Sequence, residues 1–382
     1  MQNIFVTKIH IGKVRHLKNV DIALSDTQRK HLILTGKNGS GKTSLLKAMS
    51  AYVLRKQYES GGNDIYNMWN HHYAELQKIE DPGVAISFSQ QSINFFDSMF
   101  VFIAADRSKL IVPTAIEAVE IKGKTVVERN ASRDFLKYVL HLDYQLYGAI
   151  NDNNSMLTAN LKNWFDNFLT ALRNIYDCQE LTLQRDVKKL AFRIEMPGRE
   201  PFGLHEMSDG YAAFLDIYME LLMRLETADA EVKYDTPAIV MIDEIETHLH
   251  VELQRRILPF LTQMFPNVQF IVATHSPFVI NSLENAVVYD LEKNESLEKP
   301  SFYSYETVVE SFLDTSMYST ELKRYFGRYK ELCFKQRTPE ENDEFLRAKA
   351  ELEIRSIPST ELYIAFQEIE KRRKAGKSDS LD

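Results

Sequence analysis

One segment of the sequence has the residue types and the spacing needed to hold phosphate groups. Residues 36–43 read Gly-Lys-Asn-Gly-Ser-Gly-Lys-Thr, which matches the pattern GxxxxGK followed by Ser or Thr. Glycines let such a loop wrap closely, so that its N–H groups and the N-terminus of the following helix face the phosphates. Lys42 can then reach the β- and γ-phosphates of a nucleoside triphosphate, and the Thr43 hydroxyl can ligate Mg²⁺. The residues expected to bind the nucleotide are Gly36, Lys37, Asn38, Gly39, Ser40, Gly41, Lys42, Thr43 and Ser44.

Two further polar sites follow apolar runs in the second half of the chain. Asp243 and Glu244 come directly after the run 238–242, and His275 follows the run 269–273. In α/β sheets, ligands bind at the carboxyl ends of the strands, where these side chains would emerge. Asp243 is expected to complete the Mg²⁺ shell, and Glu244 to activate the attacking water. His275 is expected to donate to the γ-phosphate.

A fourth segment precedes a helix predicted over residues 214–225. It consists of Ser208, Asp209 and Gly210, and a serine hydroxyl with free N–H groups at a helix N-terminus suits a phosphate. The same residues are also typical of an ordinary helix cap. The residues alone leave both interpretations open.

The elements that must position these segments alternate along the chain. Apolar runs predict strands at residues 4–11, 20–24, 31–35, 84–89, 99–104, 238–242, 269–273 and 286–289. Helical spacing begins near Lys42 and recurs over about 131–176, which we interpret as a helical insertion. Strands that alternate with helices predict a parallel sheet covered on both faces. From about residue 291 the chain becomes charged and helical.

Composition and charge restrict the class of protein. The chain has 382 residues, of which 44% are hydrophobic, so it can bury a large core, and its net charge of −8 does not suit a general polyanion binder. Two cysteines without a pairing pattern, no signal peptide and no membrane-spanning run predict a soluble cytoplasmic protein that does not contact a membrane. Basic residues at 323–330 and 371–374 are either solvated helix faces or contacts to a nucleic-acid backbone, so DNA is a possible partner.

The order of the four segments resembles the head of ATP-binding-cassette (ABC) ATPases. The segments 242–250 and 273–277, with Gln254 between them, are similar to the SMC, RecF-like and OLD-type branch of the AAA-family ATPases. They are most similar to the ATPase subunits of the Septu and retron anti-phage defence systems. The sequence departs from this pattern at Asp209, Ile245 and Val251, none of which is a catalytic group.

The resemblance implies a fold and a domain organisation. An α/β head over residues 1–290 would have a mostly parallel sheet flanked by helices, an antiparallel β subdomain and the helical insertion. Residues 291–382 would form a helical C-terminal region that docks a partner.

The resemblance also implies a composite ATP site between two subunits. Ser208, Asp209 and Gly210 of one chain would close on the ATP held by the other, giving a homodimer or a higher oligomer. A Q-loop residue is also expected, and Asp106, Arg107 and Gln90 are the candidates.

Two other chemistries fit the sequence less well. Glu246, His248 and His250 offer three metal ligands, but the family pattern better accounts for them as a loop beside the composite site. The residues after His275 lack the acidic pattern of a nuclease, so any cutting would need a partner protein.

These observations predict an enzyme that converts ATP and water to ADP and phosphate with Mg²⁺. The leading hypothesis is a switch or sensor that controls a separate effector, a nuclease, in prokaryotic anti-phage defence. One alternative is a RecF- or SMC-like genome-maintenance ATPase that acts on DNA without an effector. Another is an ATP-stabilised scaffold with negligible turnover.

Overall fold

The computed structural model divides the chain into two compact units, Met1–Val308 and Val309–Asp382. It describes residues 4–61, 83–90, 93, 95, 99–106, 134–186, 191–225, 236–303, 307–309, 319–355 and 361–374. No helix in these described ranges is both long enough and apolar enough to cross a membrane.

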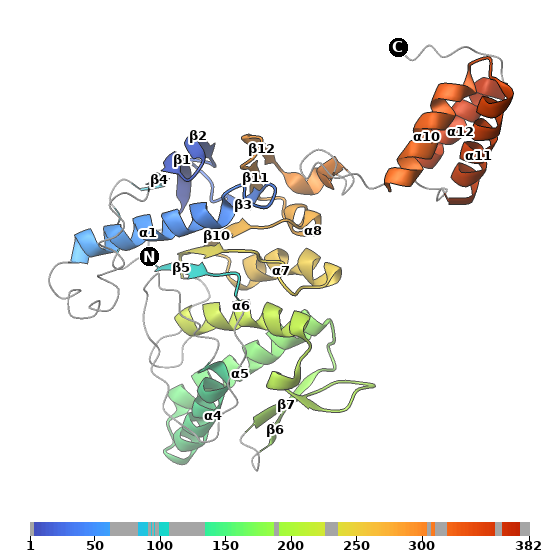
Figure 1. The fold of residues 1–382 in the computed structure, drawn as a ribbon. Coiled ribbons are helices and arrows are strands. Elements are labelled where there is room, and N and C mark those ends of the chain that lie inside the picture. Colours follow the sequence, from blue (N-terminus) through green and yellow to red (C-terminus); the bar gives the residue numbers. More distant parts are fainter. Residues whose placement is uncertain are drawn as a thin grey trace. The chain divides into compact units, whose positions relative to one another are not determined.

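The first unit is built on a six-stranded sheet with the strand order β12-β11-β3-β10-β9-β5 (Figure 1). Its strands are β3 (His31–Thr35), β5 (Met99–Ile103), β9 (Ala238–Ile242), β10 (Val268–Ala273), β11 (Ala286–Asp290) and β12 (Glu295–Glu298). All neighbours pair in parallel except β11 and β12. Every residue of β3, β9, β10 and β11 is buried, because helices cover both faces of the sheet.

Helices and a second sheet enclose the central sheet. Helix α1 (Lys42–Gly61) lies between it and an antiparallel sheet of order β2-β1-β4, formed by β2 (Leu17–Ala23), β1 (Val6–Val14) and β4 (Val84–Phe88). Helices α6 (Asp209–Leu225) and α7 (Val251–Met264) lie on the opposite side (Figure 1), followed by the short α8 (Pro277–Ile280). The expected α/β head with an antiparallel β subdomain is thus confirmed.

One buried glutamine joins the two sheets. Gln269 on β10 is fully buried, and its side-chain oxygen accepts a hydrogen bond of 2.7 Å from Val6 N on β1. Its amide nitrogen donates to the carbonyl oxygens of Val6 at 3.0 Å and Lys30 at 2.7 Å. The side chain therefore satisfies backbone groups at the point where β1 meets the central sheet.

The helical insertion consists of two helices, α4 (Phe135–Asn151) and α5 (Ser155–Tyr176). The Asn154 side chain caps α5 by accepting from Leu157 N, and Asp177 ends the helix in the left-handed region. Three short antiparallel strands follow, β6 (Thr182–Asp186), β7 (Ala191–Glu195) and β8 (Phe202–Gly203), then the 3₁₀ turn η2 (Leu204–Glu206). Sequence patterns did not predict this small sheet, because its strands are short and mostly half-exposed.

The second unit contains a three-helix bundle. Its helices are α10 (Thr320–Cys333), α11 (Pro339–Arg355) and α12 (Glu361–Lys374). In the first unit, the turn η3 (Pro300–Phe302) follows β12. The bundle core contains Tyr329, Phe345 and Phe366. Glu370, on α12, is also buried. It accepts hydrogen bonds from Tyr329 and Arg373 and forms an ion pair with Lys349. The predicted helical character of the C-terminal region is confirmed.

Candidate functional site

The sheet order brings three of the predicted segments together. The glycine-rich loop follows β3, His275 follows β10, and Asp243 and Glu244 follow β9. These strands are neighbours in the order β3-β10-β9 and run parallel, so their carboxyl ends meet at one edge. Segments that are far apart in the sequence therefore form one site.

The glycine-rich loop has the backbone that its sequence predicts. Gly36, Gly39 and Gly41 have φ values of +129°, +87° and +99°, which side chains other than hydrogen rarely allow. A Cβ atom on Gly36 would also lie 2.9 Å from Ser40 Oγ. These glycines are therefore required by the turn itself.

Lys42 lies at the centre of the loop and is only 6% exposed. Its ammonium group donates to the carbonyl oxygens of Gly36 at 2.8 Å and Lys37 at 3.2 Å. Burial lowers the pKa of Lys42, and the negative charges of Glu246 and Asp243 oppose that shift. The loop thus holds a buried cation beside carboxylates, which suits a bound anion with an associated metal ion.

The two acidic residues after β9 differ in their surroundings. Asp243 is 3% exposed, and its backbone N–H donates to the carbonyl of Ile103 over 2.9 Å. Glu244 is exposed, has φ of +43°, and accepts a hydrogen bond of 3.2 Å from the Thr247 hydroxyl. This left-handed conformation is strained for a residue with a side chain, so the surrounding loop must hold Glu244 in it. The buried carboxylate suits a metal ligand, and the exposed one can reach a water molecule.

The oxygen donors fit Mg²⁺. Thr43 presents an exposed hydroxyl at the N-terminus of α1, and Asp243 supplies a carboxylate that acts electrostatically on Lys42. Hydroxyl and carboxylate oxygens are ligands that Mg²⁺ prefers, with phosphate oxygens and waters completing the shell. Elsewhere in the described part of the chain, no cluster of three His, Cys, Asp or Glu side chains could hold a metal.

His275 is half-buried between the two neighbouring loops. Its backbone N–H donates to Oε1 of Glu246 over 2.6 Å, and Ser276 caps α8 immediately after it. Burial and the nearby charge of Lys42 lower the pKa of His275, against the carboxylates of Glu246 and Glu244. The imidazole is therefore favoured in its neutral form, which still has one N–H to donate.

The segment Ser208–Gly210 begins α6. Ser208 and Asp209 are exposed, and the Ser208 carbonyl accepts from Ala212 N over 2.9 Å. Gly210 packs closely on the loop after β9, because a Cβ atom there would lie 3.2 Å from the carbonyl oxygen of His248. This helix N-terminus is therefore open to another molecule and rests on the acidic loop of its own chain.

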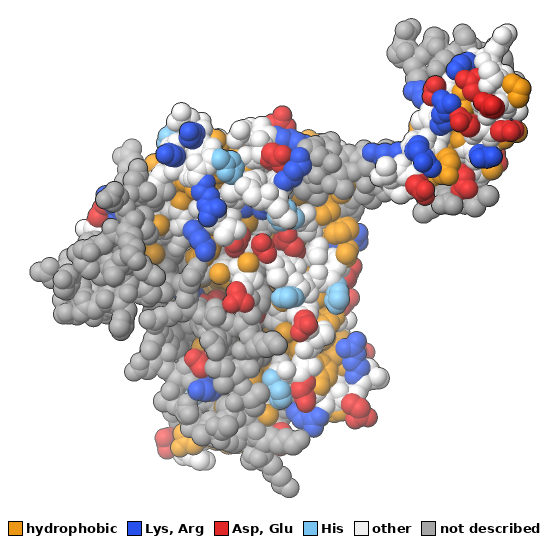
Figure 2. Space-filling view, in the orientation of Figure 1, with side chains coloured by type: hydrophobic (Ala, Val, Ile, Leu, Met, Phe, Trp, Pro, Cys, Tyr) orange, Lys and Arg blue, Asp and Glu red, His pale blue; other side chains and the backbone are white. Residues whose placement is uncertain are grey.

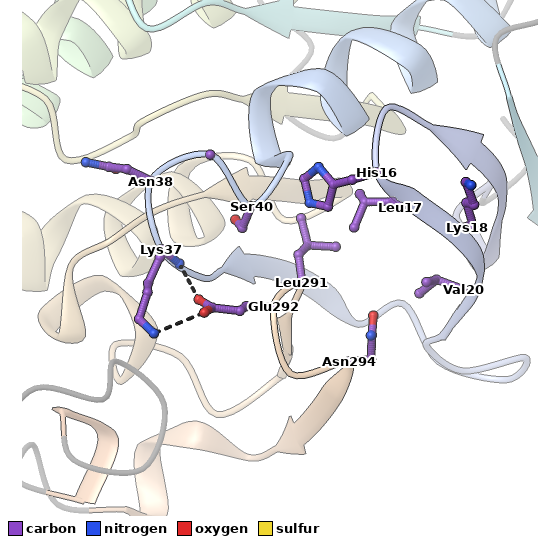
Figure 3. Close-up of a pocket in the computed structure, with 11 residues that line it drawn as sticks. His16, Leu17, Lys18, Val20, Lys37, Asn38, Ser40, Leu291, Glu292 and Asn294 are labelled. Atoms are coloured by element: carbon purple, nitrogen blue, oxygen red, sulfur yellow. Dashed lines mark hydrogen bonds and ion pairs between the residues drawn. The ribbon is translucent and has the colours of Figure 1, made fainter.

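A pocket of about 450 Å³ lies beside the glycine-rich loop (Figure 3). The β1–β2 turn, the loop and the turn between β11 and β12 line it, through His16, Leu17, Lys18, Val20, Lys37, Asn38, Gly39, Ser40, Leu291, Glu292 and Asn294. Lys37 closes one side through an ion pair of 3.0 Å with Glu292. Sequence reasoning identified only the loop residues, since nothing local links the two turns to them.

The surface near this pocket is basic, although the whole chain is acidic. Exposed Lys13, Arg15 and Lys18 lie on β1, β2 and their turn, and Figure 2 shows Lys and Arg side chains gathered over these strands. Basic side chains close to the glycine-rich loop favour the approach of a polyphosphate.

The Q-loop candidates lie in two places. Asp106 is exposed three residues after β5, which pairs with β9, whereas Gln90 follows β4 of the antiparallel sheet. Arg107 lies outside the described residues. The Q-loop residue stays a prediction.

Two family models match the chain. One, described as "AAA domain, putative AbiEii toxin, Type IV TA system", matches residues 114–281, and one described as "AAA domain" matches residues 8–196. The Septu protein PtuA of Bacillus mycoides (strain KBAB4) is 25% identical over 313 residues, which cover 77% of this chain and 41% of PtuA. The Retron Ec83 probable ATPase of Escherichia coli is 29% identical over 175 residues, covering 44% of this chain and 32% of that protein. The predicted ATPase resemblance is confirmed.

The match extends over less than half the length of each of these relatives. Among solved structures, an SMC head bound to the C-winged helix domain of ScpA is 14% identical with a TM-score of 0.42. This match covers 79% of this chain and 100% of the SMC head chain. The cbiO1 protein of the Clostridium perfringens ABC transporter complex cbiONQ is 13% identical, with a TM-score of 0.40, over 82% of this chain and 97% of its own.

Proposed function

We propose that this chain binds ATP with Mg²⁺ and hydrolyses it. The observation that carries the proposal is the convergence of Lys42, Asp243, Glu244 and His275 at one sheet edge, with Lys42 under the electrostatic influence of the carboxylates. The pocket beside the loop has the size of a ligand site and could hold the base and sugar of the nucleotide.

Each residue has one task in this reaction. The loop N–H groups and Lys42 hold the β- and γ-phosphates, so that Lys42 exchanges its bonds to loop carbonyls for bonds to phosphate. Glu244 accepts a proton from the attacking water and orients it. His275 donates to the γ-phosphate. Thr43 and Asp243 would hold Mg²⁺, which would supply neutralisation of charge and polarisation at the phosphates.

The exposed segment Ser208–Gly210 supports a composite site. Ser208 and Asp209 lie at the N-terminus of α6, where free N–H groups favour an anion. In the proposed dimer, this segment of one chain contacts the ATP of the other. ATP then stabilises the dimer, and hydrolysis releases it.

The relatives support a role in anti-phage defence. One is named a Septu protein and another a retron probable ATPase, so we propose that the chain is the ATPase of a comparable system. In this proposal the ATP-dependent dimer controls a separate effector, a nuclease, which docks on the C-terminal helical region (291–382).

Lys42 and Glu244 test the ATPase proposal. Lys42→Ala should abolish binding of a fluorescent ATP analogue, whereas Lys47→Ala, an exposed lysine on α1, should leave binding unchanged. Glu244→Gln should still bind but hydrolyse at least about a hundredfold more slowly, since a general base contributes that much. It should also accumulate as a dimer with Mg-ATP in light scattering. Wild-type turnover in Glu244→Gln would refute the assigned role.

The Glu244→Gln variant also tests the partner. It would be purified with Mg-ATP from its native host, and the associated molecules identified. A stoichiometric nuclease supports the effector switch. Nucleic acid without a protein would instead support the genome-maintenance alternative, and a bare oligomer with phosphate release near background would support the scaffold.

A further inference from the structure

Two side-chain hydrogen bonds join the loop after β9 and helix α7 to the loop after β10. Oε1 of Glu246 accepts from the backbone N–H of His275 over 2.6 Å. On the other side of His275, the Ser276 hydroxyl donates to Oε1 of Gln254 over 2.6 Å. Gln254 in turn donates to the carbonyl of Leu249 over 2.7 Å. We call Glu246 and Gln254 the loop clamp, because they hold His275 from both sides.

The backbone around Glu246 is unusually constrained. Glu244 and His248, two residues to either side, both have positive φ, at +43° and +66°. Both turns are closed by hydrogen bonds, from Thr247 N to Glu244 O at 3.0 Å and from Leu249 N to Glu246 O at 2.9 Å. Such conformations persist only where the surroundings enforce them, so the loop that carries Glu246 is held in one shape.

The surroundings of Glu246 do not favour the stability of the fold. In the part of the chain that the structure describes, its Oε2 is buried and has no hydrogen-bond partner. A buried carboxylate oxygen without a partner is unfavourable, and an apolar side chain in its place would avoid that cost. Glu246 has the largest effect among the carboxylates that act to raise the pKa of Lys42, so it lies close to the phosphate site.

We propose that Glu246 is a positioning residue that holds the His275 backbone, and so its imidazole, where the γ-phosphate is cleaved. Gln254 supports the same loop from the opposite side. This role rests on the proposed ATP hydrolysis. Neither residue touches the reacting atoms, so loss of the clamp displaces His275 while the nucleotide still binds through the glycine-rich loop.

The test compares Glu246→Ala with Glu246→Gln, which keeps a side-chain oxygen for the His275 N–H. Glu246→Ala should lower kcat at least about tenfold, because small displacements of catalytic groups reduce rates strongly. The dissociation constant of the fluorescent ATP analogue should not rise in either variant, because both remove a negative charge that acts on Lys42 and leave the glycine-rich loop intact. Glu246→Gln should recover most of the lost kcat. Glu284→Ala, an exposed carboxylate between α8 and β11, is the matched control.

Amide hydrogen exchange gives a second readout, measured without nucleotide. Peptides covering residues 271–277 should exchange faster in Glu246→Ala than in the wild type, and at the wild-type rate in Glu246→Gln. If Glu246→Ala proves poorly folded, Gln254→Leu removes the other half of the clamp and should lower kcat in the same direction.

Three results would overturn this role. Wild-type kcat in Glu246→Ala would show that the clamp has no part in hydrolysis. A loss in Glu246→Gln as large as in Glu246→Ala would show that the charge matters and not the accepted hydrogen bond. Absence of turnover in the wild type would refute the proposed function and this role together.

Discussion

Replacing Gln269 tests the hydrogen bonds that connect the central sheet to the antiparallel sheet. Gln269→Leu keeps a similar volume but removes the three hydrogen bonds to Val6 N, Val6 O and Lys30 O. Each such bond contributes about 1 kcal/mol, and a buried backbone group left without a partner costs about 1–3 kcal/mol. The backbone groups of Val6 are enclosed, whereas the Lys30 bond is partly exposed. The variant should therefore lose about 4 kcal/mol of unfolding free energy in the first unit.

Urea denaturation followed by far-UV circular dichroism measures this loss. Gln28→Leu is the control, because Gln28 is an exposed glutamine in the same unit and should change stability by less than about 0.5 kcal/mol. A loss below about 1 kcal/mol in Gln269→Leu would refute the reasoning, since it would mean that other groups satisfy Val6. The β1–β2 turn lines the pocket, so Gln269→Leu should also weaken binding of the fluorescent ATP analogue.

Two further predictions concern buried titratable groups. Burial lowers the pKa of His31 from 6.5 to about 4, and its Nδ1 accepts from Phe270 N over 3.0 Å. Since the unfolded state binds the proton more readily, stability should be constant above pH 6.5 and fall by up to about 3 kcal/mol as the pH drops towards 4. Thermal unfolding at several pH values should show this slope, and His31→Asn, which keeps an acceptor, should flatten it. Burial opposes ionisation of Glu370, but hydrogen bonds, led by that from Arg373, lower its pKa to about 2. Glu370→Gln should destabilise the three-helix bundle by about 1–2 kcal/mol, because it removes the negative charge that the partly exposed Lys349 and Arg373 contact. Hydrogen exchange in α10, α11 and α12 should then accelerate, whereas unchanged exchange would show that the network is not stabilising.

The elements and motifs that are contiguous in the sequence could be predicted from it. The loop 36–43, the helix that follows it, and the polar residues after two apolar runs depend on local spacing and residue type. A run such as 238–242 must be buried on both faces, so its carboxyl end and the acidic residues there follow from the pattern. The C-terminal helices could also be predicted, because charge and helical periodicity are local features of the sequence.

Contacts between distant segments were decided only by the tertiary structure. The sequence does not show that Gln269 satisfies Val6, that Glu246 holds His275, or that the β1–β2 turn lines a pocket with Glu292. Each contact joins residues whose separation depends on strand order and register, and these are set by the packing of the whole sheet. Local residue patterns determine which side chains follow the end of a strand. Only the packing of the whole core determines which of these side chains come into contact.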